Sequence, residues 1–100
     1  MDCVLYKADG TQAPYEPADG KHFTLEELQH AVGGYIEMVN LGDGRMLVVN
    51  EEGKVNHLPL NEKGTRLTRG ILSWRDLVVG DVLVCPEDAL QGEDEDEHES

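Results

Sequence analysis

One helix signal stands out in this sequence, because the residues on either side of it follow a different pattern. Thr24 is followed three residues later by Glu27, the spacing of a capping box, in which each side chain accepts a hydrogen bond from an otherwise unpaired backbone N–H. Apolar residues then recur at helical spacing, at Leu25, Leu28 and Val32. Gly33 can adopt the left-handed conformation that ends many helices. The sequence therefore predicts a short helix over residues 24–32.

Strand-like segments surround this helix. They are short runs of β-branched, aromatic and other apolar residues separated by glycine-containing turns, which is typical of antiparallel sheets. These runs occupy residues 2–7, 35–40, 45–50, 54–58 and 77–85. The three middle runs follow one another closely, so they predict an antiparallel meander.

Two segments lack such a pattern. Residues 11–20 contain two prolines and a glycine, and they predict a loop. Residues 59–69 predict irregular structure with at most one helical turn near residues 61–63, because Gly64 would interrupt a longer helix. Together these features predict an α+β fold, with one short helix packed on an open or barrel-like antiparallel sheet of about five strands.

Acidic residues are concentrated near the C-terminus. Residues 87–100 hold eight of the 21 acids and no Lys or Arg, whereas the rest of the chain has 13 acids and eight bases. A block of like charges repels itself and buries nothing. We therefore expect a single domain over residues 1–86, followed by a disordered acidic tail over residues 87–100.

The chain lacks the usual signals for membranes and secretion. No apolar run approaches the roughly 20 residues of a membrane helix, and the N-terminal MDCVLYKADG lacks the basic and apolar regions of a signal peptide. We expect an intracellular protein, in a reducing cytosol where thiols are not oxidised. Cys3 and Cys85 each lie in a strand-like run and are expected to be buried thiols, with a disulfide as the alternative.

Residues with catalytic or metal-binding chemistry are scattered. The four histidines, His22, His30, His57 and His98, show no zinc spacing with each other or with cysteine, and no phosphate-binding glycine motif occurs. A nucleophilic trio of Cys85, His57 and a carboxylate would require the fold to bring them together. We therefore predict no catalytic residue, no metal and no cofactor.

A basic segment offers the main candidate for a ligand site. Residues 54–75 hold five bases against one acid, in a chain of net charge −13. Arginine forks match phosphate geometry, so this segment and nearby polar residues can form an anion site. The candidate residues are Tyr35, Glu37, Asn50, Asn61, Lys63, Arg66, Arg69 and Arg75. The alternatives are ordinary surface charges, a contact with the acidic tail, and structural hydrogen bonds by the polar residues.

Two features are candidates for contact with a protein partner. Trp74 is either a core aromatic or an interface anchor. The tail resembles a polyanion that can compete for a basic protein surface, or serves only as a solubilising extension; its central acids are Glu93, Asp94, Glu95, Asp96 and Glu97. The overall negative charge disfavours direct binding to nucleic acid. The sequence does not indicate an oligomeric state.

Three longer segments carry a family resemblance. LEELQHAVGGYIEMV, LVVNEEGKVNHLPLN and DLVVGDVLVC resemble the phage- and plasmid-borne proteins of domain-of-unknown-function family 3846, over residues 23–85. The resemblance implies a mobile-element gene expressed in the cytoplasm of a bacterial host cell, and no mechanism. Our leading hypothesis is a non-enzymatic interaction protein that binds a host protein in counter-defence or host takeover. The alternatives are a protein that binds or sequesters a signalling nucleotide, and an unrecognised enzyme.

Overall fold

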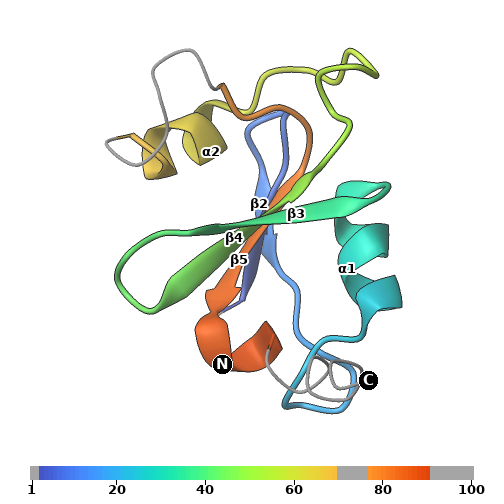
Figure 1. Ribbon diagram of the computed structural model, residues 1–100, viewed down its shortest axis with the longest axis vertical. Coiled ribbons are helices and arrows are strands. Elements are labelled where there is room, and N and C mark those ends of the chain that lie inside the picture. The colour runs from blue at the N-terminus through green and yellow to red at the C-terminus, as the bar shows by residue number, and fades with distance from the viewer. Residues whose placement is uncertain (1–2, 70–76, 91–100) are drawn as a thin grey trace, which may run out of the picture.

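The computed structural model describes residues 3–69 and 77–90, and its strands form one antiparallel sheet (Figure 1). The sheet has five strands in the order β2-β1-β5-β4-β3, and it is open because β2 and β3 are its two edges. In chain order, the elements are β1 (Val4–Tyr6), β2 (Gln12–Pro14), α1 (Leu25–Val32), β3 (Ile36–Asn40), β4 (Arg45–Asn50), α2 (Glu62–Leu67), β5 (Val82–Pro86) and the 3-10 helix η1 (Glu87–Leu90). The predicted α+β class is confirmed, and of the two sheet forms the structure has the open one.

Helix α1 begins and ends where the sequence predicts. The Thr24 hydroxyl accepts a hydrogen bond from the Glu27 N–H at 3.1 Å, and the Glu27 carboxylate accepts one from the Thr24 N–H at 2.9 Å. Gly33 follows with a φ of 81°, and its N–H donates to the Gln29 carbonyl. Both ends of α1 are therefore fixed by local interactions.

One face of the sheet is covered by α1 and η1. Leu28 and Val32 of α1 belong to the same core cluster as Leu83 on the central strand β5. Ala89 and Leu90 of η1 also lie in this cluster. The folded domain therefore extends at least to Leu90, and the expected boundary at residue 86 falls too early.

The opposite face is covered by α2 and the segment that precedes β5, and Figure 1 shows α1 and α2 on opposite sides of the strands. Val78 and Leu67 pack with Leu47 and Val82 in a second cluster. Gly64 lies inside α2, where a Cβ would lie only 2.8 Å from Cγ1 of Val78. The prediction that Gly64 interrupts helix formation is wrong, because this glycine instead allows α2 to approach the core closely.

The loop predicted over residues 11–20 contains strand β2. Tyr15 donates its N–H to the Cys3 carbonyl, so the backbone groups of every second residue along β2 point toward β1. Pro14 lies between two such residues, and its backbone points away from the sheet. A proline is tolerated at such an outward position, because no ladder hydrogen bond needs its missing N–H.

One further predicted strand is wrong, and another is confirmed only in its second half. Residues 54–58 lie in a series of turns, in which Asn56 donates its N–H to the Glu52 carbonyl and Leu58 donates to Gly53. The predicted strand over residues 77–85 is regular only from Val82, and before it Val79 forms an isolated bridge with Leu60. The predicted meander is thus limited to the β3–β4 hairpin. The other side of β4 pairs with β5, which comes much later in the chain.

Within the described residues, no helix is both long and apolar enough to cross a membrane.

The capping box provides a direct test of how α1 is fixed. Thr24→Ala should lower the free energy of unfolding by about 1 kcal/mol, because the Glu27 N–H loses its acceptor at the helix start. Urea unfolding followed by circular dichroism measures this change. Thr24→Ser keeps the hydroxyl and should remain close to the wild type. Equal stability of the alanine variant and the wild type would contradict the account.

Candidate functional site

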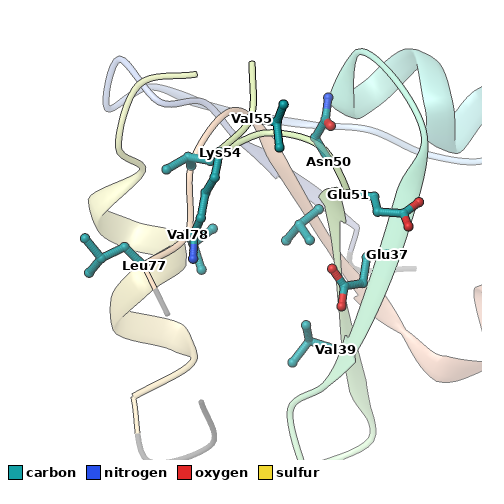
Figure 2. Close-up of a pocket in the computed structure, with 10 residues that line it drawn as sticks. Glu37, Val39, Asn50, Glu51, Lys54, Val55, Leu77 and Val78 are labelled. Carbon is teal, nitrogen blue, oxygen red and sulfur yellow. The ribbon is translucent and has the colours of Figure 1, made fainter. Parts of the chain in front are cut away.

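A groove of about 300 Å³ lies between the β3–β4 side of the sheet and the segment that precedes β5 (Figure 2). We refer to it as the apolar groove. Its lining consists of six aliphatic residues and four charged or polar ones: Glu37, Val39, Val49, Asn50, Glu51, Lys54, Val55, Leu77, Val78 and Val79.

The strand register explains which side chains reach the apolar groove. Side chains alternate between the faces of a sheet, so Glu37 and Val39 of β3 project on the α2 side together with Val49 of β4. Figure 2 shows Leu77 and Val78 on the opposite wall, beside α2. The groove therefore has a valine floor between two walls that come from different parts of the chain.

Asn50 holds the turn that borders the apolar groove. Its side-chain oxygen accepts a hydrogen bond from the Glu52 N–H at 2.8 Å, and its side-chain nitrogen donates to the Val32 carbonyl at 3.1 Å. These bonds join the end of α1 to residues 51–57, from which Lys54 and Val55 extend over the groove (Figure 2). Asn50 was a predicted ligand residue, but its polar atoms are used within the fold.

The surface of the apolar groove combines exposed aliphatic groups with carboxylates. Val55 is 76% exposed and Leu77 is 46% exposed at its rim. Glu37 and Glu51 lie on one side, and Lys54 lies on the other (Figure 2). Exposed apolar surface rimmed by charged groups is typical of sites that bind other proteins or peptides.

A second hollow, of about 440 Å³, lies between the β1–β2 hairpin and the start of α2. Three cationic side chains border it, Lys7, Lys63 and Arg66, and we refer to it as the basic hollow. The Lys63 ammonium lies 5.5 Å from the centre of the Tyr6 ring, in a cation–π contact. Arg66 is 4.0 Å from Glu62, so its exposed guanidinium is only weakly paired.

The acids beside the basic hollow are Asp9 and Glu62. Asp9 accepts hydrogen bonds from both the hydroxyl and the N–H of Thr11, and the hydroxyl bond is the main cause of the lowered pKa of this carboxyl. Asp9 therefore stays charged and reduces the positive potential around the hollow.

The predicted ligand residues occupy several places. Lys63 and Arg66 share the basic hollow, as the anion-site hypothesis requires, whereas Arg69 lines neither this hollow nor the apolar groove. Glu37 lies in the apolar groove, and Tyr35, 64% exposed, borders a shallower hollow beside the end of α1. No signal in the sequence points to Lys7, which the β1–β2 hairpin places beside α2. The remaining candidates lie outside the described residues: Trp74, Arg75, Glu93, Asp94, Glu95, Asp96 and Glu97.

Asn61 has a structural role. It is 1% exposed, and its side-chain nitrogen donates to the carbonyls of Tyr6 at 2.9 Å and Gly80 at 2.8 Å. Its side-chain oxygen accepts from the Gly64 N–H at 2.9 Å, which caps α2. Asn61 thus joins β1, the turn before β5 and α2, and although it lines the basic hollow, both its side-chain nitrogen and its side-chain oxygen bond within the fold.

The cysteines do not present an activated nucleophile. Cys3 and Cys85 are both buried thiols, and burial, with a smaller effect of Cys3, raises the pKa of Cys85 to about 12. His57 lies in the turn over residues 51–57 with a φ of 59° and is exposed. Cys85 therefore stays protonated, which disfavours the nucleophilic trio. The described part of the chain also contains no group of three or more His, Cys, Asp or Glu residues arranged to hold a metal ion.

The fold and these two surfaces define a small α+β protein with an open sheet and two separate candidate binding sites. The chain belongs to the family described as Domain of unknown function (DUF3846), whose sequence profile matches residues 1–98. This match is longer than the resemblance over residues 23–85. No curated protein and no solved structure matches the chain.

The role of Asn61 can be tested by its removal. Asn61→Ala should lower the free energy of unfolding by about 2–3 kcal/mol, because two carbonyls and one N–H lose their partners inside the protein. The exposed Asn56→Ala is the matched control and should have little effect on urea unfolding. An Asn61→Ala protein as stable as the control would show that these bonds are not structural.

Proposed function

We propose that this protein is a non-enzymatic interaction protein of a phage or plasmid, which binds a host protein in the bacterial cytoplasm. The single observation that carries the proposal is the apolar groove, with its exposed Val55 and Leu77. In the setting that the family resemblance suggests, binding of this kind serves counter-defence or host takeover.

The apolar groove suits a protein partner for two physical reasons. Burial of Val55 and Leu77 by a partner removes aliphatic surface from water, at about 25 cal/mol for each Å². The groove lies between two walls, so an inserted side chain can be surrounded and fully desolvated, as in the central anchors of stable interfaces.

The charge of the chain indicates which partners it favours. A net charge of −13 attracts basic protein surfaces over distances of about a Debye length and raises the rate of encounter. Glu37 and Glu51 place acids beside the apolar groove itself. The preferred partner is therefore a protein with an apolar segment next to basic residues.

The groove hypothesis is tested by adding a charge at its rim. Val55→Glu should abolish or strongly weaken capture of the partner from bacterial lysate, because the new carboxylate would have to be desolvated in the complex. The control is Leu25→Glu, which places the same change at a 53% exposed leucine on α1. Loss of capture in both variants, or in neither, would contradict the proposal.

The same capture experiment separates the groove from the acidic tail. The deletion should remove residues 91–100 and keep η1, because Ala89 and Leu90 belong to the core. Weaker capture after this deletion would assign part of the affinity to the polyanion, and unchanged capture would assign the affinity to the folded domain.

A second candidate function is the binding of a small phosphate-bearing ligand, such as a signalling nucleotide. The observation that favours it is the basic hollow, where Lys7, Lys63 and Arg66 come together from two parts of the chain. Ammonium and guanidinium groups can together hold a phosphate, with the guanidinium binding two oxygens at once.

Thermal shift with ATP and with inorganic pyrophosphate tests the second candidate. At a hundredfold excess over Kd, a bound ligand stabilises the folded protein by about 2.7 kcal/mol, which raises the unfolding temperature measurably. The rise should disappear in Lys63→Ala and Arg66→Ala and persist in Arg69→Ala, which changes an arginine outside the hollow. A flat response of the wild type, or equal rises in all variants, would exclude the basic hollow as the site for these ligands.

A further inference from the structure

The two edges of the sheet differ in their capacity to accept another strand. Edge strand β2 has only three residues, and one of its two outward-facing residues is Pro14, which has no N–H to donate. Edge strand β3 has five residues, Ile36–Asn40, with no proline, lysine or arginine. Proteins usually protect an edge with charged residues, proline or a very short strand, and β3 has only the single acid Glu37, so it is the less protected edge of this sheet.

The hydrogen bonds around β3 establish which groups face outward. Glu51 donates its N–H to the Tyr35 carbonyl at 2.8 Å, and Leu41 donates to the Arg45 carbonyl at 3.0 Å. Odd-numbered residues of this strand therefore bond to β4, and the even-numbered residues face away. No other group within residues 3–69 and 77–90 forms a hydrogen bond with the outward N–H and C=O groups of Ile36, Met38 and Asn40. We refer to these groups as the open edge.

The open edge adjoins the apolar groove. Glu37 and Val39 lie on the same strand and project into the groove, whereas Met38 projects to the other face, where it is 43% exposed. A strand placed beside β3 would therefore have alternate side chains next to the groove and next to Met38.

We infer that the partner supplies an extended segment that pairs with the open edge and adds a sixth strand to the sheet. This inference rests on the proposed protein-binding function and specifies the mode of binding. Main-chain hydrogen bonds to Ile36, Met38 and Asn40 provide affinity, and the side chains on either face provide selectivity.

The neighbouring side chains define the chemistry of the segment. Glu37 favours a lysine or arginine beside it on the groove face, since opposite charges on adjacent strands attract. Val39 on that face and Met38 on the other favour aliphatic or aromatic neighbours. The segment is therefore a short strand in which one basic residue is followed or preceded by apolar residues.

Charge argues for another protein as the source of this segment, and against a second copy of this chain. Strand β3 carries one acid and no base, so a second β3 strand would bring no cation to Glu37. Two copies would also each carry a net charge of −13.

The experiment uses a phage-displayed library of random peptides, selected on the full-length protein. The enriched peptides should show one basic residue next to consecutive apolar residues, and a synthetic copy should slow hydrogen exchange at the amides of Ile36, Met38 and Asn40. Met38→Pro should weaken binding of that peptide by about tenfold or more, because it removes an outward N–H and obstructs strand pairing. Met38→Ala keeps the N–H and is the matched control, with a smaller loss of affinity.

Each contrary result has a distinct meaning. Peptides that bind Met38→Pro and Met38→Ala equally, and protect amides elsewhere, would overturn the inference while protein binding stands. A wild-type dimer that Met38→Pro converts to a monomer would assign the open edge to a second copy and also overturn it. Failure to enrich any peptide would overturn it too, and the Val55→Glu capture experiment would then decide the proposed function separately.

The proline variant must fold for this comparison. In the wild type, the N–H of Met38 makes no bond within the sheet, so its loss should cost little stability. Thermal unfolding of Met38→Pro should therefore stay close to that of Met38→Ala. If Met38→Pro does not fold, Asn40→Pro with Asn40→Ala as its control supplies the second pair, since Asn40 also faces outward.

Discussion

Burial of the central strand β5 on both faces is the constraint on which the rest of the structure depends. This strand pairs with β1 on one side and β4 on the other, and its first four residues are buried. Leu83 and Cys85 face α1, whereas Val82 and Val84 face α2 and Val78. A strand that is apolar on both faces needs a cover on each, so the chain must supply two covering layers from separate segments.

The apolar groove exists because α2 and Val78 cover only part of one face of the sheet. Helix α2 and Val78 pack on the cluster that contains Val82 and Val84, while β3 lies one strand beyond β4 at the edge. The sheet is therefore wider than the layer of α2 and Val78 that covers this face. The apolar groove lies beside that layer, along the part of the sheet that it leaves uncovered. The open edge and the groove are adjacent for this reason, and a single extended segment can contact both.

Local signals in the sequence predict the parts of the fold that are stabilised locally. The capping box at Thr24 is sufficient to place α1, and alternation places β3 and β4. Helix α2 was predicted only as a single turn near residues 61–63. Its continuation through Gly64 depends on the close approach of this glycine to Val78, a contact between residues distant in sequence. For the candidate site, the sequence identified Lys63 and Arg66, but it could not identify Lys7, because only the folded β1–β2 hairpin places that residue beside α2.

Native-state hydrogen exchange of the free protein tests this account most directly, because it measures both the buried strand and the unpaired edge in one experiment. The account predicts that the amides of β5 exchange only through global unfolding. In β3, Glu37 and Val39 should be protected, while Ile36, Met38 and Asn40 should exchange much faster. Equal protection of odd and even residues along β3 would contradict the open edge, and fast exchange throughout β5 would contradict the two-sided core.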